Sequence, residues 1–173
     1  VVAVGECGLD YDRLQFCSRA VQRLGFEAQL EVADACGLPL FLHNRNTGGD
    51  FSDVCASRRM RAGGVVHSFD GGSEELGRLL GLGLHIGLNG CSLKTSDNLA
   101  VASQVPLHAL HLETDAPWCS IKRTHAGHGH VRPVCSVTSG APWAEEKKER
   151  WRVDALVKDR CEPCHIVHVL QVC

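Results

Sequence analysis

Short apolar stretches alternate with longer segments of helical periodicity over roughly the first two-thirds of the chain. Each apolar stretch is bounded by glycine, proline or polar residues, which is typical of short buried strands. The intervening segments carry apolar residues at steps of three and four, which predicts helices. Strands are therefore predicted at residues 1–6, 38–43, 64–69, 84–90 and 110–115, and helices at 18–36, 50–62, 73–81 and 97–104.

This alternation predicts an α/β fold in which parallel strands are joined by crossover helices. The first helix is expected to end at Gly37, since glycine commonly terminates helices. The fourth is expected to be capped by Ser96 or Asp97. The face of the first helix expected to be buried comprises Val21, Leu24, Ala28, Val32 and Ala35.

The regular alternation stops after Asp115. Residues 119–142 combine glycine, proline, serine, histidine and cysteine without a period, which predicts a long loop. A charged helix is predicted at 144–157, and a last helix near Pro163, because proline suits the first helical position. We expect residues 1–173 to form a single domain.

Four of the five predicted strands carry a potential metal ligand at or near their carboxyl ends: Glu6, His43, His67 and Asp115. Parallel strands of a barrel deliver these ends to one rim, where active sites lie. A single histidine or glutamate there is more often a hydrogen-bonded or turn residue. Four together favour a shared site for Zn²⁺, Mn²⁺ or Mg²⁺, ions that carboxylates and imidazoles bind.

Polar and aromatic neighbours extend this rim. Arg45 can contact a phosphate or carboxylate with two hydrogen bonds, or form a surface salt bridge. Asp10 and Asp12 are either acceptors behind the metal ligands or turn residues, and the turn is favoured for Asp12. Asn89 would line the same rim, and Trp118 would either stack on a base or pack against the protein.

Charge and composition narrow the class of protein. With 18 basic and 20 acidic residues the net charge is −2, which argues against a broad basic surface for nucleic acid. We expect no membrane association, because no apolar run approaches the roughly 18 residues of a bilayer span. No secretory signal precedes the ten cysteines, and Cys36 and Cys55 fall in helical segments, so we expect reduced thiols and an intracellular location, nuclear or cytoplasmic.

The single methionine and a cysteine-rich stretch near the end of the sequence each lead to a separate prediction. The only methionine is Met60, which suggests a processed, truncated or partly described chain. Cys161 to His165 read CEPCH, which fits a haem attachment pattern, a redox dithiol or half a zinc site. Without an axial partner or an export context we expect no haem, and interpret this stretch as the start of a helix.

The motifs GECGLDYDR, PLFLHNR, GVVHSFDG, IGLNGCSLKT and LHLETDAPW occur in the order and spacing of the TatD family of metal-dependent deoxyribonucleases. The chain resembles the eukaryotic branch of that family. The resemblance runs from Val1 to about residue 127 and resumes over 158–166, whereas residues 128–157 do not look like a family segment.

The resemblance implies a (β/α)₈ TIM barrel of the amidohydrolase-like metal-dependent hydrolase type, with up to two Mg²⁺, Mn²⁺ or Zn²⁺ ions and DNA as substrate. Carried over by motif, Glu6 would bridge the two ions, and His43 and His67 would complete the shell of the second. Asp115 would bind the first ion and orient or deprotonate the attacking water. Arg45 would contact the phosphate. Partner proteins are not indicated.

The chain also departs from the family pattern. The family's opening strand with His-x-His, which supplies two ligands, does not occur in the sequence. A complete barrel takes about 250 residues, so we expect a partial barrel without its N-terminal strands, with poor nuclease activity or none. The alternatives are a non-catalytic product that binds metal, DNA or a partner, and a metallohydrolase of another small phosphoester or amide.

Overall fold

The structure, a computed structural model, describes residues 1–58, 60–135 and 139–173. Two compact units make up this part of the chain. The first contains Val1–Gly87 and Val105–His111, and the second contains Leu88–Gln104 and Leu112–Cys173. The single-domain organisation stays a prediction, and each unit is described by itself.

The main sheet contains the five strands that the sequence predicts, in the sequential order β1-β2-β3-β4-β5. The pairs β1–β2, β2–β3 and β3–β4 are parallel, so the α/β prediction is confirmed. The first strand starts later than expected and continues past Glu6, while Val1 and Val2 are exposed. The strands are β1 (Val4–Asp10), β2 (Leu40–Arg45), β3 (Gly64–Val66), β4 (His85–Leu88) and β5 (Leu110–Leu112).

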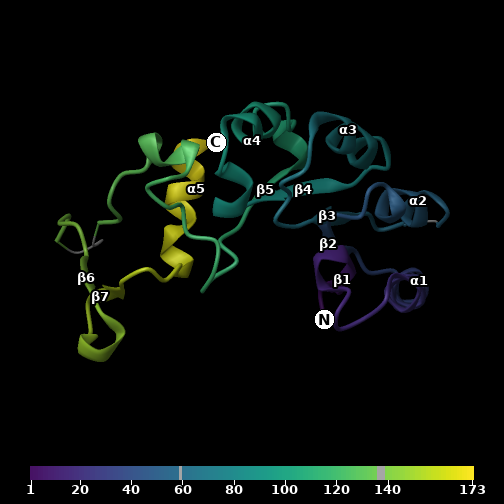
Figure 1. The fold of residues 1–173 in the computed structure, drawn as a ribbon, viewed down its shortest axis with the longest axis horizontal. Helices are drawn as coiled ribbons and strands as arrows, with labels where there is room; N and C mark the ends of the chain where they lie inside the picture. The colour runs from purple at the N-terminus through teal and green to yellow at the C-terminus, as the bar shows by residue number, and fades with distance from the viewer. Residues whose placement is uncertain (59, 136–138) are drawn as a thin grey trace. The chain divides into compact units, whose positions relative to one another are not determined.

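The four helices predicted between these strands are also present, and α1, α2 and α3 lie on the same side of β1, β2 and β3 (Figure 1). Gly37 ends the first helix as predicted, in a left-handed conformation with φ of 65°. The cap of the fourth helix is Thr95, whose side chain accepts a hydrogen bond from the backbone N–H of Asn98, rather than Ser96 or Asp97. The helices are α1 (Arg19–Cys36), α2 (Asp50–Ala56), α3 (Ser73–Gly81) and α4 (Ser96–Ala102), so α2 ends earlier than predicted.

The predicted buried face of α1 is wrong. Phe26, Leu30 and Ala33 are buried instead, again at steps of four and three. Phe26 stacks on Phe51 of α2 with ring centroids 5.3 Å apart. An aromatic ring buries more area than a valine or leucine, so the stripe that contains Phe26 faces the core. The residues of the predicted face, Val21, Leu24, Ala28, Val32 and Ala35, are all exposed.

Apolar side chains from strands and helices form the core of the first unit. Leu9, Leu42, Phe51, Val66 and Ile86 are almost completely inaccessible to solvent. Full burial of each such side chain contributes about 1.5–3 kcal/mol relative to exposure. Because β1, β2 and β3 each place an apolar residue in this core next to a polar site residue, core packing fixes the position of the site.

The ten cysteines, all within the described residues, are free thiols in the structure, and they are expected to differ in reactivity. Burial raises the pKa of Cys55 to about 12, with a smaller contribution from Cys7. At pH 8 Cys55 therefore stays protonated and unreactive, whereas Cys36 is exposed. We expect iodoacetamide to label Cys36 in the folded protein and Cys55 only in urea, as measured by peptide mass spectrometry. Equal labelling rates without urea would contradict this packing.

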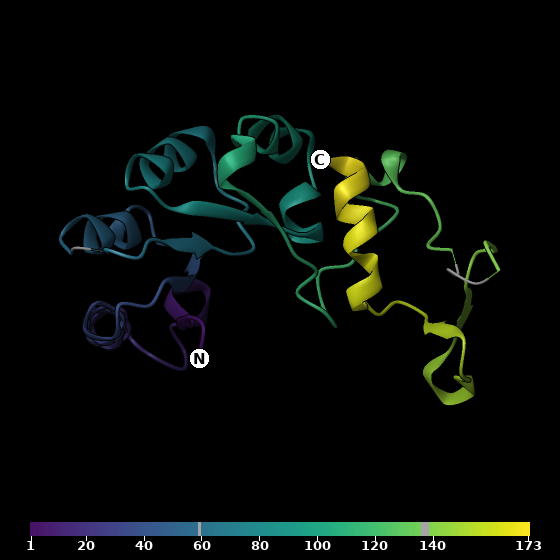
Figure 2. The same cartoon turned by 180° about the vertical axis from the view of Figure 1, so that it is seen from behind.

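The charged helix predicted at 144–157 is wrong. Two short parallel strands, β6 (Ala144–Glu146) and β7 (Ala155–Val157), flank a single 3-10 turn, Lys148–Arg150 (Figure 2). The segment has helix-favouring residues but little apolar surface to bury on one helical face. Pairing as β7 buries Ala155 and Leu156, and this tertiary gain outweighs helix propensity.

The remainder of the second unit follows the predictions more closely. The expected loop contains a 3-10 helix at Ala126–His130. The last helix begins with a 3-10 turn at Pro163–His165 and continues as α5 (Ile166–Val172). In the described part of the chain, no helix is long and apolar enough to cross a membrane.

Candidate metal centre

Glu6 lies at an irregularity of the β1–β2 ladder. Gly5 pairs with Phe41 and Cys7 with Leu42, so Glu6 is the extra residue of a bulge. A bulge re-aims one side chain without ending the strand. The Glu6 carboxylate is directed to His43 and His67 and remains 48% exposed.

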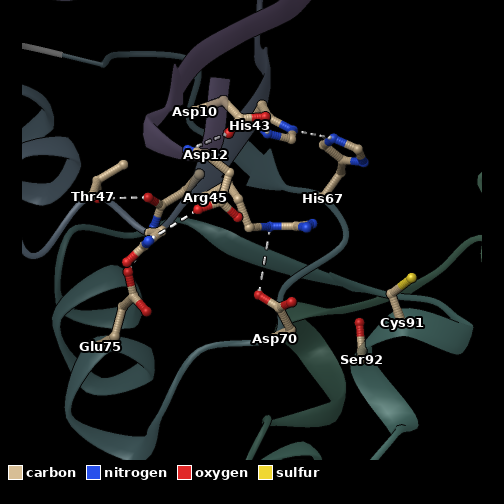
Figure 3. Close-up of polar contacts among 12 residues, drawn as sticks. Asp10, Asp12, His43, Arg45, Thr47, His67, Asp70, Glu75, Cys91 and Ser92 are labelled. Carbon is tan, nitrogen blue, oxygen red and sulfur yellow. Dashed lines mark hydrogen bonds and ion pairs between the residues drawn. The ribbon is translucent and has the colours of Figure 1, made fainter. Parts of the chain in front are cut away.

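Three ligand atoms meet at one point, from Glu6 of β1, His43 of β2 and His67, the residue that follows β3. Glu6 Oε1 lies 2.7 Å from His67 Nε2 and 3.0 Å from His43 Nδ1. The two imidazole nitrogens are 3.1 Å apart (Figure 3). Within the described residues this is the one group of three or more such side chains with ligand atoms mutually close enough to hold an ion. The structure thus brings together three of the four predicted ligands.

The donor set fits a divalent cation. With a proton on one of the two imidazole nitrogens, the rings share a hydrogen bond at 3.1 Å, and a proton on either ring can also be donated to Glu6 Oε1. A divalent cation can take the place of these protons, because all three atoms then offer it a lone pair. Ligand atoms about 2.0–2.2 Å from Zn²⁺ stand roughly 3.3–3.6 Å apart in tetrahedral geometry, so the 2.7–3.1 Å spacing in the structure would widen by about half an ångström around a bound ion.

Packing holds His67 in place. Its side chain is only 6% exposed, and its ring stacks on Phe41 with centroids 4.8 Å apart. Its backbone N–H donates to the carbonyl of Leu42, which extends the β2–β3 pairing by one residue. His67 therefore enters the site from the first position after β3, with little freedom to rotate.

Asp10 supports His43 from the far side. Asp10 Oδ2 lies 3.3 Å from the buried His43 Nε2, which forms no well-aligned hydrogen bond in this arrangement. Gln22 of α1 clamps the backbone of Asp10, accepting from its N–H at 2.8 Å and donating to its carbonyl at 2.9 Å. Asp10 also accepts a hydrogen bond from the backbone N–H of Asp12, which fits the turn role. A carboxylate behind a ligating histidine orients the ring, and this second role of Asp10 stays a prediction.

Arg45 ends β2 on the same side of the sheet as His43. Its Nε lies 3.8 Å from Asp70 Oδ1, a long ion pair, and is buried without a hydrogen bond (Figure 3). The neighbouring Asn44 is held by Glu75, to which its Nδ2 donates at 2.7 Å. The contacts of Asp70 and Glu75 with β2 were not predicted from the sequence, because both residues lie far from β2 along the chain.

Asp115, Asn89 and Trp118 belong to the second unit. The Asp115 carboxylate accepts from the Cys119 thiol at 3.2 Å, and its backbone is left-handed with φ of 51°. Asn89 is completely buried, caps the 3-10 helix Gly90–Leu93, and donates from Nδ2 to Glu113. Trp118 is 71% exposed and so is not packed. The metal-binding role of Asp115 and the stacking role of Trp118 stay predictions.

The CEPCH stretch has a structural role at the start of the last helix. Glu162 and His165 form a capping box, with the Glu162 N–H donating to His165 Nδ1 at 2.9 Å. Glu162 Oε1 also accepts from the backbone N–H of Val157 at 2.7 Å. This agrees with the helix-start interpretation.

The family described as TatD related DNase matches residues 1–173, including the segment 128–157. The chain is 44% identical to deoxyribonuclease Tat-D of Schizosaccharomyces pombe, over 99% of this chain and 54% of that protein. It is 38% identical to the putative deoxyribonuclease TATDN1 homolog of Encephalitozoon cuniculi, over 99% and 55%. The 3'-5' ssDNA/RNA exonuclease TatD of Yersinia pseudotuberculosis is 43% identical over 68% of this chain and 46% of that protein.

Solved structures confirm the fold. A TatD family hydrolase from Entamoeba histolytica superposes with a TM-score of 0.87 at 34% identity, over 99% of this chain and 55% of the other. An uncharacterized amidohydrolase from Saccharomyces cerevisiae gives 0.83 at 34% identity, over 97% and 57%. The chain thus spans about half the length of the relatives it matches, and its fold is a partial TIM barrel of the amidohydrolase type. By sequence and fold, the chain belongs to the TatD-related DNase family.

Proposed function

We propose that this protein acts as a metal-dependent deoxyribonuclease of the TatD type, with Glu6, His43 and His67 holding one divalent ion. The observation that carries the proposal is the convergence of three ligand atoms within 2.7–3.1 Å of one another. The deoxyribonuclease names of the relatives support DNA as the substrate.

The residues of the site have distinct tasks. His43 and His67 offer neutral nitrogen ligands, and Glu6 supplies the negative charge that a dication requires. A divalent ion bound there supplies Lewis acidity, which lowers the pKa of water and neutralises charge on a phosphoryl oxygen. Asp10 keeps the His43 ring oriented.

Two further residues enter the proposal from the family motifs. Asp115 would hold a second ion or accept a proton from the attacking water. Arg45 would bind a phosphate of the DNA, because its guanidinium has donors that its long ion pair with Asp70 leaves available.

A nuclease assay tests the function. We expect the purified chain to hydrolyse single-stranded DNA with Mg²⁺, Mn²⁺ or Zn²⁺, weakly, and to lose this activity in EDTA. Glu6→Gln is expected to be inactive, and His108→Asn, which changes an exposed histidine of the same unit, to be unchanged. Ion binding without any DNA hydrolysis would favour the non-catalytic alternative. Turnover of only small phosphodiesters or amides would favour another metallohydrolase.

The role of Arg45 predicts a change in KM. We expect Arg45→Gln to raise the KM for DNA roughly tenfold or more, since a hydrogen bond to a charged group contributes about 1.5–3 kcal/mol, with a smaller change in kcat. Steady-state kinetics at two salt concentrations measures this. Arg61→Gln is the matched control, because Arg61 forms a surface ion pair with Asp34 at 3.3 Å. Equal KM values for both variants would show that Arg45 does not bind the DNA phosphate and only forms its ion pair with Asp70.

A further inference from the structure

Two cysteines of the second unit have their sulfur atoms almost within bonding distance. Cys91 lies in the 3-10 helix Gly90–Leu93, and Cys119 lies in the turn that follows Asp115. Their Sγ atoms are 2.8 Å apart, which is about 0.8 Å longer than a disulfide bond. They are separated by 28 positions in sequence, so only the fold brings them together.

The backbone on both sides of this pair is tightly held. A Cβ on Gly90 would lie 2.0 Å from the carbonyl oxygen of Cys119, so the two loops touch at a point that only glycine permits. The backbone N–H of Cys91 donates to Asn89 Oδ1 at 2.8 Å, and that of Trp118 donates to the Asp115 carbonyl at 2.9 Å. The sulfur atoms can therefore bond through a small side-chain shift.

A shared metal ion fits this pair less well. Two thiolates bound tetrahedrally at about 2.3 Å from Zn²⁺ stand roughly 3.7 Å apart, well beyond the 2.8 Å in the structure. In the described ranges, moreover, no third ligand atom joins the two thiols to make a cluster of three. Disulfide formation is the chemistry that the sulfur–sulfur distance favours.

We propose that Cys91 and Cys119 are a modification site, at which a glutathione-type disulfide oxidises the two thiols to a reversible intramolecular disulfide. The hydrogen bond with Cys91, burial and Asp115 raise the pKa of the Cys119 thiol, so Cys91 is the residue that attacks oxidised glutathione first and releases one reduced glutathione. Cys119 then loses its proton, attacks the Cys91 sulfur of the mixed disulfide and releases the second. The two protein thiols lose two protons and two electrons, and one oxidised glutathione takes these up to become two reduced molecules.

The disulfide removes a hydrogen bond from Asp115. In the reduced protein the Cys119 thiol donates to Asp115 Oδ2 at 3.2 Å; once Cys119 is oxidised, that proton is gone. The modification itself does not depend on the proposed nuclease function. An effect of the disulfide on catalysis does rest on the proposed nuclease function, because it would act through Asp115, the carboxylate to which the family motif gives a catalytic role.

Disulfide mapping of the full chain tests the proposal without relying on activity. The chain is equilibrated in glutathione buffers of increasing oxidised fraction, quenched with N-ethylmaleimide and digested with trypsin. Cleavage after Arg78, Lys94 and Lys122 places Cys91 and Cys119 in separate peptides, 79–94 and 95–122, each with no other cysteine. We expect these two peptides to become cross-linked as the main oxidised product and to separate again in dithiothreitol.

Variants identify the bonding partners. Cys164→Ser, at an exposed cysteine of the same unit, should leave the 79–94 to 95–122 cross-link intact, and Cys91→Ser should abolish it. If Cys91→Ser does not fold, the disulfide-linked peptides of the unsubstituted protein still show whether Cys91 bonds to Cys119. The proposal is overturned if both peptides carry N-ethylmaleimide at every oxidised fraction. It is equally overturned if Cys119 pairs with Cys161, which is buried and donates to the Thr114 carbonyl.

Discussion

Replacing His67 by asparagine is expected to lower the affinity of the chain for Mn²⁺ or Zn²⁺ by more than about 100-fold. Loss of a residue that only orients a ligand costs about 10–100-fold, and His67 is in the proposed ligand set itself. Its ring is buried against Phe41, so no other side chain can take its place without repacking. Isothermal titration calorimetry measures the affinity directly.

His108→Asn is the matched control, since His108 is exposed on a 3-10 helix of the same unit. We expect its affinity to equal that of the unsubstituted chain. Urea unfolding of both variants shows whether the effect comes from the site or from lost stability. An unchanged affinity in His67→Asn would remove this residue from the ligand set.

Replacing Gly8 by alanine is expected to destabilise the chain by at least about 3 kcal/mol, the upper part of the range for overpacking. The added Cβ would lie 1.9 Å from the carbonyl oxygen of His43, and Gly8 has a φ of 153° that side chains rarely adopt. The atoms that the Cβ meets belong to the backbone of His43, so β1 and β2 must separate. Because His43 is the residue displaced, ion affinity should fall as well.

Gly25→Ala provides the control for Gly8→Ala. Gly25 lies inside α1, where an added Cβ meets nothing within 4 Å. Alanine is favoured over glycine in a helix by about 0.5–1 kcal/mol, so this variant should be slightly more stable. Urea denaturation monitored by circular dichroism compares the two. A Gly8→Ala protein as stable as the Gly25→Ala protein would show that the β1–β2 contact is looser than described.

Sequence periodicity was sufficient to predict the main sheet and the side of it on which the site lies. Parallel strands place their carboxyl ends together, so His43 and His67 could be assigned to one rim from their positions at the ends of apolar stretches. The bulge at Glu6 could not be predicted, because it depends on how β1 pairs with β2.

Other features depended on tertiary packing and were therefore missed. The buried face of α1 is set by the contact between Phe26 and Phe51, which α1 alone does not reveal. Residues 144–157 have helix-favouring composition, but burial of Leu156 in β7 outweighs it. The cysteines were expected to be reduced and apolar in character, and the approach of Cys91 to Cys119 arises only from the fold.

Crystals soaked in Mn²⁺ and measured at a wavelength where manganese scatters anomalously provide the most direct test of the central claim. The account predicts an anomalous peak between Glu6 Oε1, His43 Nδ1 and His67 Nε2, at roughly 2.0–2.3 Å from each atom, as expected for first-row divalent ions bound by nitrogen and oxygen. The same map from His67→Asn crystals should lack this peak. A map without density at this point in the unsubstituted protein, or with its strongest peak elsewhere, would contradict the assignment of the metal centre.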